Sequence, residues 1–333
     1  MNIETMRKVD YFAGIPLCFL ATLLVRFVDL LRRRQRQHPK RVLFIELSEM
    51  GSTILADPAM RKMQEVGHAQ SYFLIFAANA ASLRLLNTIP ETHVFTIRAS
   101  GFFGLAMDSL RFLAWARRCK IDTVIDLELF SRYSTLLTGL SGAANRIGFH
   151  PFHNEGLYRG NMLTRRVAYN PHQHIAKNFV ALVNATLADQ EEHPFSKTLV
   201  EDSEIRLARA EISEHSIMAM RDRIRAEYPS YDPARHRIAL INPNASDLLP
   251  QRRWMPDHFA AVIRGLLGSV DDLLVLITGA PAEREEAEAV RELLLKRNQR
   301  RAVVIRRPPF PFDHAGAGRD RRGVGDAAVA LQD

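Results

Sequence analysis

Residues 41–64 constrain the fold more than any other part of the chain. Residues 42–47 form an almost unbroken apolar run bounded by charge, as expected for a parallel strand buried on both faces. A short polar turn containing Gly51 follows, and apolar residues then recur at the three- and four-residue spacing of a helix. A strand, a glycine turn and a helix make the first half of a βαβ unit. In open α/β sheets, ligands bind where such a strand ends.

The alternation of strand and helix patterns continues along the chain and predicts doubly wound parallel sheets. The other strand candidates are residues 72–76, 94–97, 123–127, 238–241 and 273–278, and the clearest helix candidates are residues 101–119 and 256–267. Between the two groups, residues 189–235 are charged and mostly helical in pattern. We therefore expect an N-terminal domain at 40–188, a helical connection at 189–235, and a smaller second domain at 236–305.

Charge and composition narrow the class of partner. The chain has 333 residues, is 47% hydrophobic and 25% charged, and carries a net charge of +8, which fits a globular protein of two domains or one large one. Its cysteines, Cys18 and Cys119, give neither a disulfide framework nor a metal cluster, which suits a reducing cytoplasm. The positive charge is concentrated at residues 32–41 and 296–307 without a zinc-finger or RNA-binding motif. An anionic membrane surface is therefore favoured over a nucleic acid as partner.

The N-terminal segment is apolar from residue 11 to residue 25 and is followed by Arg26, Asp29 and a basic cluster at 32–36. As a helix the uncharged run would extend roughly 22 Å, less than the ~30 Å hydrocarbon core of a bilayer. Three interpretations remain open: a spanning helix extended to Leu31, an interfacial or re-entrant anchor, and a helix packed on the globular domain. Membrane association of residues 1–38 is favoured, with the anchor ahead of the span. In either membrane case the basic flank would keep the following domain cytoplasmic.

The turn and helix after the first strand resemble those of the family 9 glycosyltransferases, the lipopolysaccharide heptosyltransferases and their relatives. The family has an aliphatic strand, then Ser-x-Leu/Met-Gly-Asp, then a helix with Pro-Ala-Leu-Arg. The residues that match are Ser48, Met50, Gly51, Pro58, Ala59, Met60 and Arg61. Ser52 stands where the family usually has an aspartate, its proposed catalytic base. A serine hydroxyl is no general base at neutral pH, so we expect Glu49 or Asp57 to replace it, although Asp57 could instead only cap or pair with a neighbour.

Two further segments of the first half resemble the acceptor side of the family. Residues 121–128 are similar to its Val-Ile-Asp-Leu-Gln-Gly strand, which lines the cleft and precedes a basic residue. Asp126, in this strand, either lines the cleft or caps the next helix. Residues 145–149 match its Arg-x-Gly-Phe, and the polar loop that follows suits an anionic sugar. The acceptor-binding residues that the resemblance implies are Gly51, Glu128, Arg132, Arg146 and His150.

We expect no metal site. His150, His153 and Glu155 lie close in sequence but lack the helical register or paired aspartates of a metal-binding motif. His172 and His174 open the next amphipathic helix and are interpreted as capping or surface residues.

The turn after the first strand of the second half resembles the donor side of the family. Residues 242–246 and the Gln-Arg-Arg-Trp that ends at Trp254 are similar to its small-residue turn and Lys-Arg-Trp-Pro segment. The family neutralises the donor diphosphate with the basic residue two before the tryptophan, here Arg252. An arginine fork grips phosphate oxygens while small turn residues let backbone N–H groups approach; a solvent-facing basic loop is the alternative. The donor-binding residues implied are Asn244, Ser246, Arg252 and Gly279.

The resemblance covers about residues 41 to 300. It implies a GT-B-like fold of two Rossmann-like domains, with the acceptor on the first and a nucleotide-sugar on the second. The implied activity is an inverting, metal-independent and cofactor-free glycosyltransfer from a donor such as ADP-heptose. The acceptor would be a lipid-linked glycan, lipopolysaccharide core or a related envelope glycan, at the cytoplasmic face of the bacterial inner membrane. Ser52 favours the alternative, a catalytically inactive protein that binds a glycan or nucleotide.

The periodic pattern stops after residues 303–305. Residues 306–333 are rich in Ala, Gly, Arg and Asp and show neither helical nor strand periodicity. Family members continue here with further βα units and an Asp-Ser-Gly-Pro-x-His segment that holds the donor. We therefore expect the second domain to be incomplete and the tail disordered, as after truncation by a reading-frame shift near Ile305. The alternative is a genuine short form whose tail folds on a partner.

Overall fold

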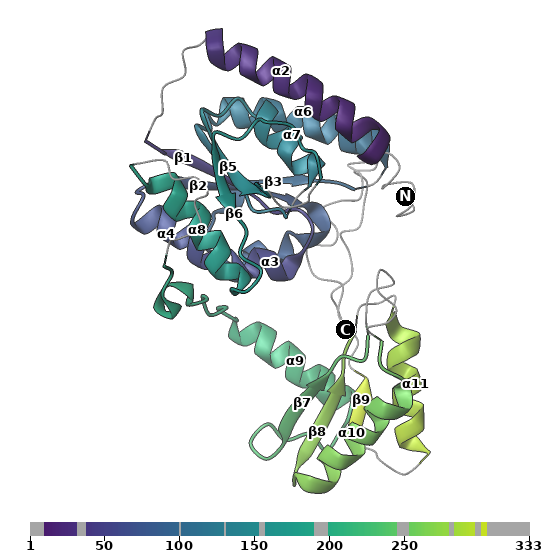
Figure 1. Cartoon of the computed structure of the whole chain (residues 1–333). Helices are drawn as coiled ribbons and strands as arrows, with labels where there is room; N and C mark the ends of the chain where they lie inside the picture. The colour runs from purple at the N-terminus through teal and green to yellow at the C-terminus, as the bar shows by residue number, and fades with distance from the viewer. Residues whose placement is uncertain are drawn as a thin grey trace, which may run out of the picture. The chain divides into compact units, whose positions relative to one another are not determined.

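A computed structural model describes residues 10–31, 38–99, 101–129, 131–152, 157–189, 199–244, 253–279, 283–296 and 301–304. The chain divides into two compact units, Met1–Glu211 and Ile212–Asp333. The first unit is built on a sheet of six described strands and the second on a sheet of three, all parallel (Figure 1). The predicted α/β class, with a large and a smaller parallel sheet, is therefore confirmed.

The first sheet has the strand order β3-β2-β1-β4-β5-β6. Its strands are β1 (Arg41–Ile45), β2 (Gln70–Phe76), β3 (Val94–Ile97), β4 (Thr123–Asp126), β5 (Asn145–His150) and β6 (Arg165–Ala168). The four strands predicted for this half match β1 to β4 to within two residues at each end. β2 and β3 lie on one side of β1, and β4, β5 and β6 lie on the other. Since β1 and β4 are parallel neighbours, their carboxyl ends adjoin.

Helices cover both faces of this sheet (Figure 1). They are α3 (Met50–Leu55), α4 (Asp57–Glu65), α5 (Ala81–Leu86), α6 (Phe102–Arg118), α7 (Arg132–Leu140) and α8 (Ile175–Leu187), with short turns η2 (Ala77–Asn79), η3 (Glu91–His93) and η4 (Asp202–Ile205). Val42 and Phe44 of β1 join the core formed with α4 and α8, whereas Leu43 and Ile45 join the core formed with α6 and α7. The apolar run of β1 is unbroken because both of its faces are buried.

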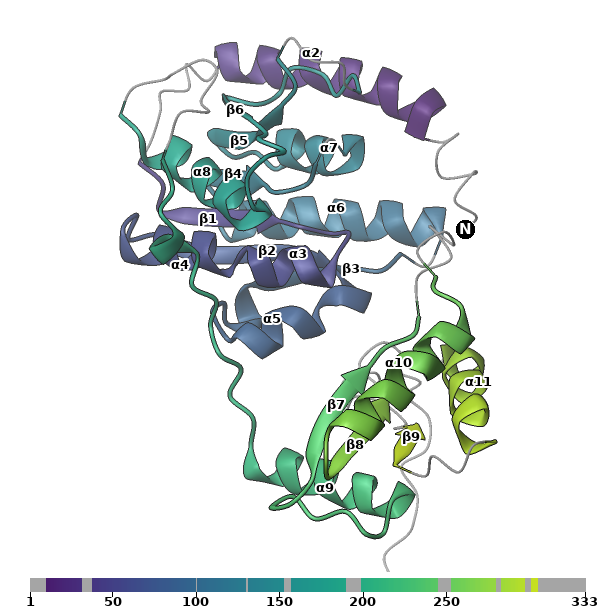
Figure 2. The same ribbon diagram turned by 60° about the horizontal axis from the view of Figure 1, so that its bottom comes forward.

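An apolar helix, α2 (Ile15–Leu31), lies outside α7 and is preceded by η1 (Asp10–Gly14) (Figures 1 and 2). It contacts the unit through Cys18, Ala21 and Val25, which form a small core with Met162. Most of the remaining apolar surface is exposed, at Tyr11 and Phe12 of η1 and at Leu17, Phe19, Leu20, Leu23, Leu24, Phe27, Leu30 and Leu31 of α2. The segment Tyr11–Leu31 is long and apolar enough to cross a membrane, by length and composition.

The second unit has the strand order β7-β8-β9, with β7 (Arg237–Ile241), β8 (Leu273–Ile277) and β9 (Ala302–Val304). Helices α10 (Pro256–Ser269) and α11 (Arg284–Leu295) pack with these strands in one core. Helix α9 (Glu214–Glu227) belongs to the same unit, because Ile224 packs with Leu274 and Leu276 of β8. The segment expected to connect the domains, residues 189–235, is thus divided between the two units. The tail at 306–333 lies outside the described residues.

Candidate functional site

The turn after β1 carries the residues on which the predicted chemistry depends. Glu49 is the N-cap of α3 in extended conformation, and its main-chain carbonyl accepts hydrogen bonds from the Thr53 N–H (3.2 Å) and the Thr53 hydroxyl (3.0 Å). Its side chain makes no capping hydrogen bond and is exposed. A Cβ added at Gly51 would meet nothing within 4 Å. The turn therefore presents an ionisable carboxylate beside open space.

Ser52, in the position of the family's aspartate, lies next to this carboxylate. Its hydroxyl donates to Oε2 of Glu49 at 3.3 Å. An acidic side chain, Glu49, therefore lies beside Ser52 at this end of the sheet. A carboxylate oriented by a hydroxyl is a suitable general base.

Asp57 has a different surrounding. It is fully buried, accepts from Arg61 Nε at 2.9 Å and from the Ala208 N–H at 3.0 Å, and also accepts from the Thr88 hydroxyl. Its carboxylate joins α4 to two distant segments of the unit. Asp57 has the pairing role that the sequence left open, and of the two acidic candidates Glu49 is the one that a ligand can reach.

Glu128 holds the turn after β1 from the end of β4. Its Oε1 accepts from the Leu47 N–H (2.8 Å), the Ser48 N–H (2.9 Å) and the Ser48 hydroxyl (2.5 Å). Glu128 is 8% exposed, so these bonds are screened little by solvent. Through these hydrogen bonds Glu128 positions the turn. One of its partners, Ser48, is the serine that matches the family motif.

Two more buried carboxyl groups lie at the same edge of the sheet. Burial, with repulsion from Glu128, raises the pKa of Glu46 to about 9. Burial raises the pKa of Asp126 to about 7, against the lowering effect of Arg159. Glu46 is therefore protonated at neutral pH, and Asp126 titrates near it. Glu46 was missed in the sequence although a charge inside a buried strand pattern is a signal of a perturbed group.

Asp126 does not cap the helix that follows it, so that alternative is wrong. The N-cap of α7 is Ser131, whose hydroxyl accepts from the Ser134 N–H at 3.2 Å. Asp126 instead accepts from the Ser134 hydroxyl (2.9 Å) and the Glu128 N–H (3.2 Å). The side chain of Asp126 thus fixes both the first turn of α7 and the segment that carries Glu128.

The end of β5 lines a cavity of about 280 Å³ with Arg159, Tyr158 and Thr135. His150 at this end has its pKa lowered to about 4 by burial and by the charges of Arg166 and Arg159, so its imidazole is neutral at pH 7. Its Nδ1 accepts from the Phe152 N–H at 2.9 Å. A neutral imidazole beside the buried Arg159 and the half-buried Arg166 suits hydroxyl and carboxylate groups of a sugar.

The remaining acceptor candidates are held in the framework. Arg132 is buried at the start of α7 and donates from Nε to the Tyr158 carbonyl at 2.8 Å. Arg146 is near the amino end of β5, four residues from His150, or about 13 Å along a strand. It donates to the Met162 carbonyl (2.6 Å) and the Ala143 carbonyl (2.7 Å) and pairs with Asp29 of α2 at 2.5 Å. The structure thus places Arg132 beside the His150 cavity and Arg146 away from it.

In the second unit, the turns after β7 and β8 meet. Nδ2 of Asn244 donates to the Thr278 carbonyl at 3.3 Å, and a Cβ added at Gly279 would lie 2.4 Å from the same nitrogen. A side chain at 279 would have to displace the Asn244 amide. Oδ1 of Asn244 is buried without a hydrogen-bond partner among the described residues. Ser246 and Arg252 lie outside the described residues.

His172 and His174, which precede α8, have the surface and capping positions predicted for them. His174 is the N-cap of α8, with Nδ1 accepting from the Ala176 N–H at 3.3 Å, and His172 is exposed, as predicted. Among the described residues, no group of three His, Cys, Asp or Glu side chains is placed to hold a metal ion. His153 and Glu155 lie outside the described part of the chain.

No family model and no curated protein sequence matches the chain. Solved structures match it. A glycosyl transferase family 9 structure from Veillonella parvula has a TM-score of 0.55 and 18% identity, covering 78% of this chain and 68% of that one. E. coli heptosyltransferase WaaC with ADP-2-deoxy-2-fluoro heptose has a TM-score of 0.56 and 14% identity, covering 81% and 77%. WaaC with ADP has a TM-score of 0.55 and 16% identity, covering 80% and 75%.

The chain has the fold of the family 9 glycosyltransferases. This confirms, at the level of the fold, the resemblance that residues 48–61 carry. It also confirms a GT-B-like class for a chain with two parallel sheets, since the WaaC structures cover about four fifths of it.

Proposed function

We propose that the protein is an inverting, metal-independent glycosyltransferase that moves a heptose-like sugar from a nucleotide-sugar to lipopolysaccharide core or a related lipid-linked glycan. The observation that carries the proposal is the hydrogen-bonded pair of the exposed Glu49 and the half-buried Ser52 at the carboxyl end of β1. It lies in a fold shared with WaaC, whose structure contains ADP-2-deoxy-2-fluoro heptose. ADP-heptose is accordingly the first donor to test.

In the proposed reaction, Glu49 takes the proton of the acceptor hydroxyl while Ser52 orients the carboxylate. The acceptor oxygen bonds to the anomeric carbon as the bond from that carbon to the diphosphate oxygen breaks, which inverts the configuration. Arg252 and the turn amides after β7 neutralise the diphosphate that leaves. Glu128 keeps the turn in place through Leu47 and Ser48. The neutral imidazole of His150 would bind a hydroxyl group of the acceptor, and the guanidinium of Arg159 would bind an anionic group.

The donor side rests on Asn244 and Gly279. A side-chain oxygen that is buried without a described partner costs stability, so a ligand N–H or hydroxyl that donates to Oδ1 of Asn244 would be bound favourably. Gly279 leaves room for this amide, because a Cβ at 279 would lie 2.4 Å from its nitrogen. The two turns would thus contact the nucleotide-sugar at the carboxyl ends of β7 and β8, where open α/β sheets bind ligands.

The test is transfer to a lipid-linked acceptor, assayed with a panel of nucleotide-sugars. Glu49→Gln keeps the size of the side chain but removes the base, and we expect kcat to fall by roughly 10²- to 10³-fold. Glu65→Gln is the matched control, because Glu65 is also exposed but ends α4 away from the turn. An unchanged kcat in Glu49→Gln would show that Glu49 is not the base.

The second candidate function is a non-catalytic protein that binds a glycan or nucleotide, which Ser52 favours. It predicts saturable binding of a nucleotide-sugar by the wild-type chain without turnover of any donor in the panel. Transfer that Glu49→Gln abolishes would exclude it.

We also propose that α2 holds the protein on the cytoplasmic face of the inner membrane. Its exposed apolar residues support association with lipid, and its contact with α7 through Cys18, Ala21 and Val25 supports an anchor that lies along the surface. The full chain should sediment with membranes, and deletion of residues 1–38 should release it. Recovery of the full chain in the soluble fraction without detergent would contradict the proposal.

A further inference from the structure

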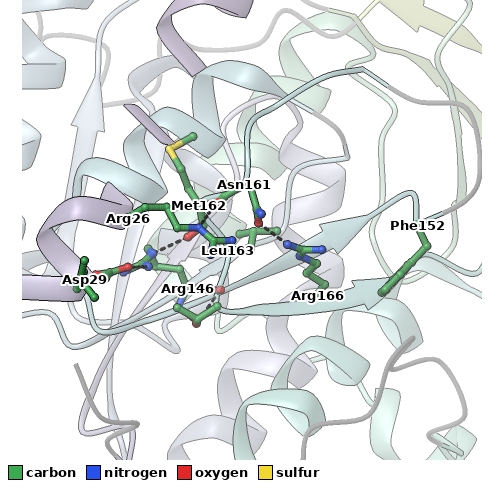
Figure 3. Close-up of a pocket in the computed structure, with 10 residues that line it drawn as sticks. Arg26, Asp29, Arg146, Phe152, Asn161, Met162, Leu163 and Arg166 are labelled. Atoms are coloured by element: carbon green, nitrogen blue, oxygen red, sulfur yellow. Dashed lines mark hydrogen bonds and ion pairs between the residues drawn. The ribbon is translucent and has the colours of Figure 1, made fainter. Parts of the chain in front are cut away.

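A cavity of about 760 Å³ lies between the C-terminal half of α2 and the segment that leads into β6 (Figure 3). Arg26, Asp29 and Leu30 of α2 line one side of it, and Asn161 and Arg166 line the other. It is separate from the turn after β1, and it shares Asn161, Leu163 and Arg166 with the His150 cavity.

Among the described residues, the cavity carries positive charge that no carboxylate compensates. Arg146, on its floor, is 2% exposed and is neutralised by Asp29. Arg26 donates from Nε to the Asn161 carbonyl at 3.2 Å, and Arg166 donates to the side-chain oxygen of Asn161. Within the described part of the chain, neither Arg26 nor Arg166 has a carboxylate partner. Two guanidinium groups thus converge on one residue with most of their N–H donors unused, a geometry suited to phosphate oxygens.

The cavity is continuous with the exposed apolar surface of α2. Leu30 lines the cavity and is also 75% exposed. Leu23, Phe27 and Leu31, at helical spacing around it, are exposed at 54, 59 and 67%. One helix therefore presents an apolar face and a cationic cavity that meet at Leu30. A molecule with a phosphate group and apolar chains would contact both.

We propose that this cavity binds the phosphate of an anionic membrane phospholipid whose acyl chains contact the exposed face of α2. The proposal rests on the membrane association proposed above and adds a specific headgroup site to it. The basic cluster at residues 32–36, which follows α2 in the sequence, favours the same anionic surface. Arg166 also lines the His150 cavity, so a phosphate of the glycan acceptor is the competing occupant.

The experiment is co-sedimentation of the full chain with phosphatidylcholine vesicles, with and without phosphatidylglycerol. We expect the double substitution Arg26→Gln and Arg166→Gln to weaken binding to the anionic vesicles on the order of 30-fold, because each basic residue at such a surface contributes about 1 kcal/mol. Binding to neutral vesicles should be unchanged, because the apolar face of α2 is intact. The control, Arg209→Gln with Arg264→Gln, removes the same charge outside the cavity and should have less than about a third of this effect.

Substitution of both arginines by lysine distinguishes a specific headgroup site from a general effect of net charge. Arg26→Lys with Arg166→Lys keeps the net charge but loses the guanidinium fork, so we expect about a fivefold loss of anionic-vesicle binding. Arg26→Gln alone, which removes one described hydrogen bond, serves if the double variant melts at a lower temperature than the wild type.

The outcomes separate the occupants. Equal losses in the cavity and control variants, or full binding by the lysine variant, would reduce the effect to net charge and overturn the headgroup site. A raised acceptor KM in detergent with unchanged vesicle binding would assign the cavity to the acceptor and overturn it as well. Failure of the wild-type chain to bind any vesicle would instead overturn the membrane association on which the proposal rests.

Discussion

The first strands of the two units, β1 and β7, have similar sequences and different surroundings. β1 reads RVLFI and β7 reads RIALI. β1 pairs with β2 and β4 and is buried at every position after Arg41, whereas β7 is at the edge of its sheet, with Ile238 41% and Leu240 68% exposed. An apolar run identifies a strand, but its place in a sheet depends on neighbours that lie far away in the sequence.

The difference extends to the faces of the two strands. Both faces of β1 are covered by helices, which gives the first unit two large cores. In the second unit, Ala239 and Ile241 contact the core with α10 and α11. Ile238 and Leu240 are on the opposite face of β7 and belong to no core of described residues. Alanine substitutions at corresponding positions of the two strands should therefore change the free energy of unfolding by different amounts.

The largest expected effect is that of Phe44→Ala against Leu240→Ala. Phe44 is fully buried, so truncation should cost roughly 3–5 kcal/mol through lost burial and a cavity, whereas Leu240→Ala should change stability by less than about 0.5 kcal/mol. Amide exchange of the full chain, read separately in peptides of each unit, measures both. A comparable loss for Leu240→Ala would show that the exposed face of β7 is covered in solution.

The ends of the two strands provide a second comparison, because β1 ends at buried carboxyl groups and β7 at the neutral Asn244. At Glu46 and Asp126 the folded first unit holds protons that the unfolded chain releases, since the pKa of Glu46 rises from 4.5 to about 9 and that of Asp126 from 3.8 to about 7. The stabilisation is complete at acidic pH below the unfolded values and is lost as pH rises through 7 and then 9.

Glu46→Gln removes one of these titrations and keeps the shape of the side chain. We expect it to raise the stability of the first unit by roughly 1–3 kcal/mol at high pH and to flatten the fall with pH, with little effect on the second unit. Denaturant unfolding at a series of pH values, followed by exchange in β1 and β7 peptides, measures this. An unchanged dependence of stability on pH would show that the Glu46 carboxylate is hydrated or paired with a cation in the folded protein, so that its pKa is not raised.

The sequence predicted those features that depend on local pattern. β1 to β4, the turn at Gly51 and the cap at His174 follow from periodicity and turn chemistry over a few residues. β5 and β6 were not predicted as strands, because Arg146 and Arg165 interrupt the apolar pattern; each is buried by carbonyl or carboxylate partners instead. Such compensation is invisible before the chain folds.

The site residues show the same limit. Glu128 acts on Leu47 across 81 residues, and Asp57 binds Ala208 across 151. Their positions at strand and helix ends were predictable from sequence, but their partners were not. The exposure of Glu49 was predictable, because it follows from the position of Glu49 in the turn itself.

The smallest effect concerns two serine caps with the same spacing. Ser131 caps α7 through the Ser134 N–H (3.2 Å), and Ser213 caps α9 through the Ser216 N–H (3.3 Å). α7 is buried on the sheet along most of its length, whereas α9 buries only Ile224 among its residues. The N–H groups freed by removing the cap of α7 are screened from water, whereas those of α9 are hydrated at once.

Ser131→Ala should therefore cost about 1 kcal/mol and Ser213→Ala about 0.5 kcal/mol or less, measured by denaturant unfolding and by exchange at the first turn of each helix. Ser131→Gly tests this screening: glycine at a hydrated N-cap costs only a few tenths of a kcal/mol, so a larger cost is expected if water does not reach the freed N–H groups. If both alanine variants lose the same stability, the two helices are equally fixed to their sheets. α9 would then be an integral layer of the second unit, as α7 is of the first, and the contrast between the units would be confined to β7.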